Sequence, residues 1–395
     1  MTLAIDNERD TKRRLILHDA VTFLSLTLIT AVLFAITLFL FRSFASHREE
    51  LAQRWSERGR AALSSGHPDQ AIVALGTALS YSPGNRSYEL LLAQALGDAG
   101  HLDESYNYFL GLWETQPGDG FINLRLARLA AVKKDMQSAV NYYRGAIYGT
   151  WEGDGAVRRR EVRLELSRYL IAHHDLSSAR TELLVAGGNA PDDMGLALTV
   201  APLLEQAGAP ADALNYYRKV LTREPRNRTA LEGAGRLEYG LGNFEEAYRL
   251  LDGAEREHVA EGTGSSNLSP QSTTMMENSG RVLAVAPRKE LSDRERVLRV
   301  VKARDIAKKR FEACNAQVAT ASGISSPLQT LAARWAGKEE TANRVALMDN
   351  PAVQEVVLRL VFDTEVQTSQ ICGAPTDDDD ATLLLLAKSP KAMGQ

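Results

Sequence analysis

The pentapeptide AVNYY (residues 139–143) returns in related form as SYNYF (105–109) and as ALNYY (213–217). The first two copies lie 34 residues apart. A fixed period of about 20–50 residues is typical of proteins that stack copies of one small structural unit. A single unit cannot bury its apolar face alone, and its neighbours in the stack bury it. The stretch DQAIVALGTALSYSPGN (residues 69–85), with one apolar face and a Pro-Gly-Asn stop, is therefore predicted to be half of such a unit.

The same register continues over residues 52–261, where the sequence resembles the tetratricopeptide repeat (TPR) family, whose period is about 34 residues. Six units follow this register: 52–85, 86–119, 120–153, 160–193, 194–227 and 228–261. Each unit departs from the family pattern somewhere. Arg58 and Ala62 replace the usual Leu and Tyr of the first unit, and Trp151 replaces the proline of the third.

The resemblance implies an all-α chain, with a TPR superhelical solenoid of about twelve antiparallel helices, an N-terminal transmembrane helix and a small C-terminal helical domain. The small and aromatic residues expected to pack between the helices are Trp55, Gly59, Ala71, Ala78, Phe109, Ala139, Tyr143, Ala179, Ala213, Tyr217 and Ala247. Gly66, Gly100, Gly208 and Gly242 stand at the inter-helix turns, where a positive φ costs glycine little. Residues 154–159 are expected to form a longer loop between the third and fourth units.

Residues 20–41 form an apolar run without charge, proline or glycine. As a helix it spans about 33 Å, enough to cross a bilayer core. We expect a retained single-pass anchor preceded by a cytoplasmic tail (1–19). The alternative is a cleaved signal peptide, but the run is long for one and no A-x-A-like site follows.

The side on which the repeats lie is not decided by the flanking arginines and lysines, which occur before and after the span. A short N-terminal tail usually stays in the cytosol, and large domains translocate largely regardless of their charge. We therefore expect an inner-membrane location with the bulk of the chain extracytoplasmic. The alternative places the repeats in the cytosol.

After the repeats, residues 262–287 are rich in Gly, Ser and Thr, and we expect a flexible linker there. Residues 288–395 are predicted to form a helical domain. Its first helix begins at the capping-box sequence Ser292–Glu295 and carries an apolar stripe at three- and four-residue steps. The stripe comprises Val297, Val300, Ala303, Ala307, Phe311, Cys314 and Val318.

No motif for a phosphate loop, a nucleophilic serine, a zinc protease or paired metal-binding cysteines occurs in the sequence. We therefore expect neither an enzyme nor a cofactor, with an enzyme in the C-terminal domain as the minor alternative. Residues 173–175 (HHD) fall at an inter-helix turn, and residues 377–380 (DDDD) precede a short helix whose positive end they complement. No metal site is predicted at either place. A net charge of −4 gives no pull toward nucleic acid.

In the TPR family, the first helix of each unit often contributes ligand contacts from its second, fifth, ninth, twelfth and thirteenth positions. The ninth positions here are Arg60, Gln94, Arg128, Arg168, Pro202 and Arg236. Arginine suits bidentate recognition of carboxylates, so the pattern suggests a groove for a partner with an acidic or carboxylate-bearing tail. The alternative is ion pairing inside the solenoid, for which Glu57, Glu161, Glu165 and Glu232 are near in sequence.

The chain has two cysteines, Cys314 on the apolar stripe and Cys372 after the third C-terminal helix. A compact helical domain would bring them together in a disulfide, which persists only in an oxidising compartment. The alternative is two separate buried thiols. From sequence alone, the chain is interpreted as a membrane-anchored scaffold or adaptor for a bacterial envelope assembly or export complex. Its partner is not specified by the sequence.

Overall fold

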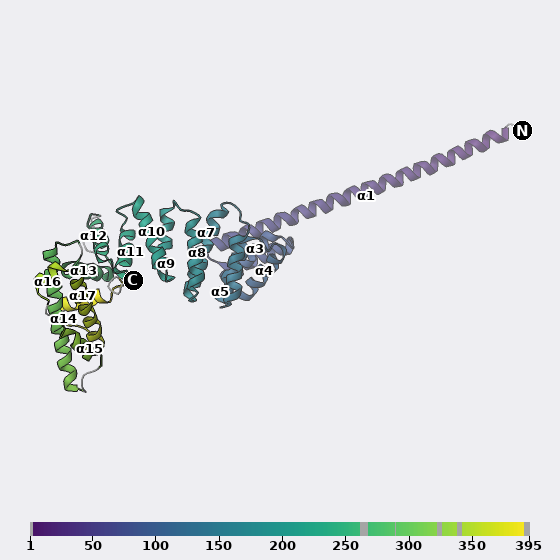
Figure 1. Cartoon of the computed structure of the whole chain (residues 1–395). Coiled ribbons are helices and arrows are strands. Elements are labelled where there is room, and N and C mark those ends of the chain that lie inside the picture. The colour runs from purple at the N-terminus through teal and green to yellow at the C-terminus, as the bar shows by residue number, and fades with distance from the viewer. Residues whose placement is uncertain (1–2, 261–267, 289, 322–325, 338–341, 391–395) are drawn as a thin grey trace. The chain divides into compact units, whose positions relative to one another are not determined.

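The computed structural model describes residues 3–260, 268–288, 290–321, 326–337 and 342–390. Within these ranges the regular secondary structure is entirely α-helical (Figure 1), as predicted. The chain forms two compact units, 1–163 and 164–395, which are described separately.

The first unit contains α1 to α6 and the beginning of α7, which crosses the unit boundary. Their bounds are α1 (Leu3–Ser64), α2 (Pro68–Tyr81), α3 (Arg86–Asp98), α4 (Leu102–Thr115), α5 (Gly120–Val132), α6 (Met136–Tyr148) and α7 (Gly155–Ala172). The helices α3 and α5 start at the residues that open the second and third predicted units. The starts of α3 and α5 are therefore 34 residues apart, which is the period of the repeat.

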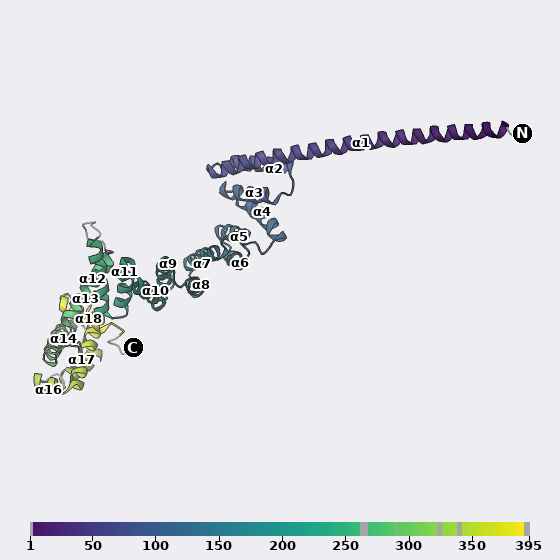
Figure 2. The same ribbon diagram turned by 90° about the horizontal axis from the view of Figure 1, so that it is seen from above.

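The helix α1 runs as one rod through the apolar residues 20–41 and on into the first repeat (Figures 1 and 2). No proline interrupts it, so nothing in its sequence forces a kink or a break. The only helix long and apolar enough to cross a membrane, among the described residues, is this one, and none of its most apolar window is buried. The C-terminal end of α1 packs against α2 as the first helix of a repeat.

The helix pairs are held together at the positions that the TPR pattern assigns to packing. The structure buries Ala71, Ala78, Ala139, Ala179, Ala213 and Ala247 completely and the rings of Phe109, Tyr143 and Tyr217 to at least 97%. Gly59 is also buried, and Trp55 is half-buried against Ala52 and Ala78. Small residues let the paired helices approach closely, and the aromatic rings fill the space between them.

The turn within each pair has one residue with a positive φ. Gly66, Gly100, Gly208 and Gly242 hold this position with φ values of 72°, 86°, 70° and 74°. Lys134 and His174 hold it in the third and fourth pairs. The turn glycines were therefore predicted correctly, and two pairs make the same turn without glycine.

The loop expected at residues 154–159 is instead the first turn of α7. Asp154 caps this helix, because its Oδ1 accepts hydrogen bonds from the backbone N–H groups of Ala156 and Val157, each at 3.1 Å. Arg159 donates to the carbonyl oxygen of Gly149 at 3.3 Å. The cap and this contact make the extra residues helical rather than irregular.

Trp151, which replaces the usual proline, closes the end of the third repeat in another way. Its indole Nε1 donates to the carbonyl of Ala146 at 2.8 Å. Next to it, Gly120 N donates to Thr150 O and Thr150 N donates to Gly118 O, each at 2.8 Å, which joins two repeat ends in an isolated parallel bridge. A Cβ atom on Gly120 would overlap the ring of Trp151, so glycine is required where this ring packs.

The second unit continues with further helix pairs and ends in a helical bundle (Figures 1 and 2). After α7, its helices are α8 (Leu176–Gly188), α9 (Met194–Gln206), α10 (Pro210–Arg223), α11 (Arg228–Gly240), α12 (Phe244–Ala260), α13 (Pro270–Val285), α14 (Asp293–Ala321), α15 (Ser326–Trp335), α16 (Arg344–Asp349), α17 (Pro351–Cys372) and α18 (Asp378–Ala387). The pairs α9–α10 and α11–α12 start at the predicted residues.

The prediction of a flexible linker at 262–287 is wrong for the residues that the structure describes, because Pro270–Val285 forms the helix α13. Residues 261–267 lie outside the described ranges. The helix packs against α11 and α12, burying Val282, Val285 and two serines, Ser272 and Ser279. Ser272 donates to Glu232 of α11 at 2.7 Å, and Ser279 donates to the carbonyl of Met275 at 2.7 Å. These serines can be buried because each has a hydrogen-bond partner. Their polar character is the reason that composition alone suggested a linker.

The C-terminal residues form the predicted helical domain around the apolar stripe of α14. Six of the seven stripe residues are buried in one core with Leu360 and Val361 of α17 and Leu383 of α18, while Val318 packs partly buried at its edge. Trp335 of α15 stacks on Phe311, with ring centroids 6.4 Å apart, and donates to Thr364 at 3.1 Å.

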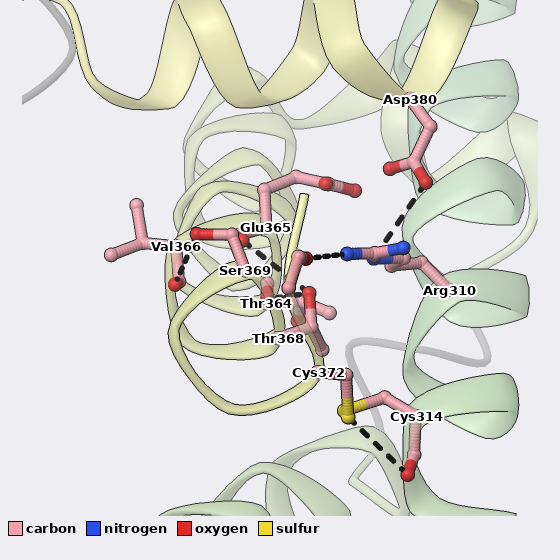
Figure 3. Close-up of a disulfide and its surroundings, with 10 residues drawn as sticks. Arg310, Cys314, Thr364, Glu365, Val366, Thr368, Ser369, Cys372 and Asp380 are labelled. Atoms are coloured by element: carbon pink, nitrogen blue, oxygen red, sulfur yellow. Dashed lines mark hydrogen bonds and ion pairs between the residues drawn. A yellow bond between two sulfur atoms is a disulfide. The ribbon is translucent and has the colours of Figure 1, made fainter. Parts of the chain in front are cut away.

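Cys314 and Cys372 are joined by a disulfide in this domain, with Cα atoms 5.7 Å apart (Figure 3). The bond connects α14 with the last residue of α17. Beyond it, Gly373 has a φ of 87° and turns the chain toward α18. The carbonyl of Gly373 accepts a hydrogen bond from Arg310, so the same part of α14 holds both the end of α17 and the turn.

The acidic run 377–380 holds α18 against the domain through one helix cap and three ion pairs. Asp377 caps the helix by accepting hydrogen bonds from the N–H groups of Asp379 at 3.0 Å and Asp380 at 3.3 Å. The other three form ion pairs, whose partners and distances are Asp378 with Arg281 (3.5 Å), Asp379 with Lys302 (2.6 Å) and Asp380 with Arg310 (3.7 Å).

Glu365 of α17 lies close to Asp380 and Arg310 and is almost completely buried (Figure 3). Neither of its carboxyl oxygens has a hydrogen-bond partner among the described residues. Burial, and then the neighbouring Asp380 carboxyl, raises the pKa of Glu365 to about 9, although the Arg310 guanidinium opposes the shift. The carboxyl of Glu365 is therefore protonated at neutral pH.

Candidate functional site

Three of the predicted groove residues lie at equivalent places on the first helices of three successive repeats in the first unit. Arg60 is on α1, Gln94 on α3 and Arg128 on α5, each 34 residues after the previous one. The two arginines are exposed and Gln94 is half-buried. The repeat therefore presents one surface of the first unit to which each of these helices contributes a polar side chain.

On α5 this surface carries four side chains at i, i+4, i+7 and i+11 spacing. The first and last are apolar, and the two between them are arginines. Phe121 is 38% exposed, Val132 is 61% exposed, and Arg125 and Arg128 lie between them along the helix. The guanidinium of Arg125 lies over the ring of Phe121, 5.1 Å from its centroid. We call these four residues the α5 stripe. Its spacing is visible in the sequence, but Phe121, Arg125 and Val132 are not at the ninth position of the repeat.

An exposed ring with a guanidinium group over it suits protein recognition, because aromatic and arginine side chains dominate the binding energy of many interfaces. The arginines supply paired donors for carboxylates. Phe121 and Val132 supply apolar area that is left exposed in the free protein. The stripe can therefore bind a protein segment that combines acidic and apolar side chains.

In the second unit, Arg236 of α11 is used inside the protein. Its Nη2 donates to both carboxylate oxygens of Glu205, at 3.2 and 3.3 Å, and its Nη1 lies 3.9 Å from Glu232. The intramolecular alternative therefore describes Arg236 in this structure. An arginine that already holds two carboxylates has little charge left to offer a third.

The network around Arg236 extends into the core of two repeats. Glu205 accepts a hydrogen bond from Tyr217 Oη at 2.7 Å. Burial, followed by this bond to Glu205, raises the pKa of the Tyr217 hydroxyl. Burial also raises the pKa of Glu232, but hydrogen bonds from Ser272 and Ser269 outweigh it, so the net pKa is lowered. These charges hold α9, α11 and α13 together.

The remaining predicted arginine, Arg168 of α7, is exposed and belongs to the second unit. The next ninth position is Pro202, which has no charge. Arg168 and Arg236 belong to the second unit, and the candidate surface of the first unit is formed by Arg60, Gln94 and the α5 stripe.

The HHD sequence at 173–175 serves the turn before α8. His174 has a φ of 61°, and Asp175 caps α8 by accepting from the N–H of Ser178 at 3.2 Å. His173 packs its ring on Tyr169, with centroids 4.2 Å apart. Among the residues with described side chains, no three His, Cys, Asp or Glu groups are placed to hold a metal ion.

Two family models match this chain. Residues 56–119 and residues 204–261 each match a tetratricopeptide repeat model. A curated relative, "Cellulose synthase 1 operon protein C" of Komagataeibacter xylinus, is 26% identical over 214 residues, which are 49% of this chain. The match spans only 15% of that relative's length.

Solved structures with a similar arrangement include three proteins at low identity. The MamA protein shares 16% identity with a TM-score of 0.37, covering 45% of this chain and 93% of that chain. YrrB, described as a TPR protein with an unusual peptide-binding site, shares 17% with a TM-score of 0.37, covering 47% and 93%. PilF of Pseudomonas aeruginosa shares 16% with a TM-score of 0.38, covering 55% and 95%.

The helix pairs keep a 34-residue register within each unit, their packing and turn positions carry the expected residue types, and family models match in both units. This chain is a tetratricopeptide repeat protein.

Proposed function

We propose that this chain is a membrane-anchored scaffold that holds a protein partner at the bacterial inner membrane, as part of an envelope assembly or export complex. The observation that carries the proposal is the continuity of α1. One uninterrupted helix contains both the exposed apolar run and the first helix of the first repeat. A stack that begins in its own anchor helix is held close to the membrane without a linker.

The surface proposed for the partner is that of the first unit, with Arg60, Gln94 and the α5 stripe. Its exposed side chains fit a segment that has carboxylates next to apolar groups. The name of the relative associates that protein with a cellulose synthase operon. This supports, for the present chain, a role beside a synthesis or export complex of the envelope.

The repeats are proposed to lie outside the cytosol. Large domains that follow a first hydrophobic segment translocate largely regardless of charge. The disulfide between Cys314 and Cys372 agrees with this side, because cytosolic thiols are kept reduced.

Carbonate extraction of membranes from cells that express the full chain, fused at its C-terminus to alkaline phosphatase, tests this proposal. We expect the fusion to stay in the membrane pellet and its phosphatase to be active. Release of the fusion by carbonate would contradict the anchor, and it is the result that a cleaved signal peptide would give. A retained but inactive phosphatase would instead place the repeats in the cytosol.

A further inference from the structure

A second candidate binding surface lies in the second unit, far along the chain from the α5 stripe. It is a cleft of about 620 Å³ where α12 begins, where α13 ends, and where α17 and the end of α18 pass nearby. This volume is within the range of about 300–1,000 Å³ that is usual for binding sites. We call it the α13 cleft.

The wall of the α13 cleft is mainly apolar and partly exposed. Leu283 of α13, Leu358 and Phe362 of α17, and Leu386 of α18 line it, and all four side chains are half-buried. Apolar side chains from three helices converge on one open space and do not fill it. They therefore leave apolar surface area that a ligand can cover.

The charged groups at the edge of the α13 cleft are mostly acidic. Glu245, Glu246 and Glu290 contribute carboxylates, and Arg288 contributes one guanidinium. Arg288 is paired with Glu245 at 3.1 Å, and Glu246 accepts a hydrogen bond from Arg249 at 2.8 Å. Glu290 is exposed, and no ion pair or hydrogen bond of its side chain is found among the described residues. The edge therefore has one carboxylate, that of Glu290, that is not balanced by an arginine, beside an apolar wall.

We propose that the α13 cleft binds a short segment of a second partner protein, in which one or two large apolar side chains stand next to lysine or arginine. The apolar side chains enter between Leu283, Leu358 and Phe362. The basic group lies at the edge, toward Glu290. This chemistry is opposite in charge to that proposed for the α5 stripe, so the protein has two sites that select different partners.

Peptide display on the full-length protein in detergent tests the proposal. Octapeptides are selected for binding to the wild-type chain, and those that also bind the variant Leu358→Glu are removed. This variant places a charge in the wall of the cleft. A second variant, Glu290→Lys, changes only an exposed edge residue and therefore leaves folding intact. The matched control is Glu355→Lys, which makes the same charge change at an exposed residue of α17 outside the cleft.

We expect the selected peptides to combine Leu, Met or Phe with Lys or Arg. They should bind Leu358→Glu and Glu290→Lys at least tenfold more weakly and the control as well as wild type. Acidic selected sequences, equal binding to wild type and both variants, or no enrichment on wild type over Leu358→Glu would overturn the proposal. A wild-type dimer that dissociates in Leu358→Glu would also overturn it, because a second copy would then be the occupant.

Discussion

Lys134 and His174 hold the same backbone conformation, with φ of 61° at each, in the turn where the other helix pairs use glycine. The left-handed conformation costs a residue with a Cβ about 1–2 kcal/mol, and glycine escapes most of this cost. Both residues are exposed at the turn, so packing of their own side chains does not explain the conformation. The two helices of the pair impose it through the turn that joins them.

Replacing Lys134 with glycine is therefore expected to stabilise the first unit. The gain should be about 0.5–1 kcal/mol, since relief of the strained φ exceeds the added freedom of the unfolded chain. Urea unfolding of the full chain in detergent measures it. Gly100→Ala is the matched control, because no atom would lie within 4 Å of the new Cβ and only the φ of 86° opposes it. This control should lose about 1 kcal/mol, and a loss in both variants would contradict the account of the turn.

Gly120→Ala is expected to destabilise the first unit by about 1–3 kcal/mol, because the new methyl group overlaps the ring of Trp151. Thermal unfolding measures the change. Adding Trp151→Ala should make the Gly120 substitution nearly neutral, since the overlapping ring is gone. Equal effects of Gly120→Ala with and without Trp151 would show that the ring is not the cause.

The sequence predicted the repeats well because each unit restates the same packing and turn positions. It missed α13 because Ser272 and Ser279 are polar, and the burial of Ser272 depends on Glu232, which lies 40 residues away. It placed residues 154–159 in a loop because the cap made by Asp154 is a local feature outside the repeat pattern. The pairing of Arg236 with Glu205 was not predicted for a similar reason: the register gives the position of Arg236, but only the structure shows Glu205 within reach.

The pKa of Glu365 predicts how the stability of the C-terminal helices depends on pH. Its folded value of about 9 lies above the ordinary glutamate value near 4.3. Stability from protonated Glu365 is therefore complete below about pH 4.3 and is lost as the pH rises toward 9. The loss is at most about 1.4 kcal/mol per pH unit in this window.

Glu365→Gln should remove this dependence, because glutamine stays neutral and nearly keeps the shape of the protonated acid. Urea unfolding followed by the fluorescence of buried Trp335, at about pH 5, 6.5 and 8, compares the two proteins. We expect the variant to gain stability relative to wild type as the pH rises. Parallel curves for wild type and variant would contradict a protonated Glu365.

The disulfide closes a loop with a sequence separation of 58 residues, so its reduction is expected to destabilise the C-terminal domain by about 4 kcal/mol. Hydrogen exchange of the amides in α14 and α17, with and without dithiothreitol, measures the change. The variant Cys314→Ala/Cys372→Ala is the control and should be insensitive to dithiothreitol. Alkylation of the thiols in intact cells gives the compartment: modification of both cysteines without reductant would show that the bond is absent in the cell.

The exposed surface of the first unit is proposed to hold a protein partner at the membrane. The direct measurement is quantitative mass spectrometry of proteins that cross-link to, and co-purify with, the full chain from native membranes. The variant Arg60→Glu/Arg128→Glu is compared with wild type and with Arg54→Glu/Arg144→Glu, which changes two exposed arginines outside this surface by the same charge. Melting temperatures should stay close in all three, because exposed charge pairs contribute only about 0–1 kcal/mol.

The account predicts that wild type and Arg54→Glu/Arg144→Glu retain the same partner and that Arg60→Glu/Arg128→Glu loses at least nine tenths of it, as expected when about 1.4 kcal/mol or more of binding energy is removed. Equal recovery of the partner by all three proteins would contradict it.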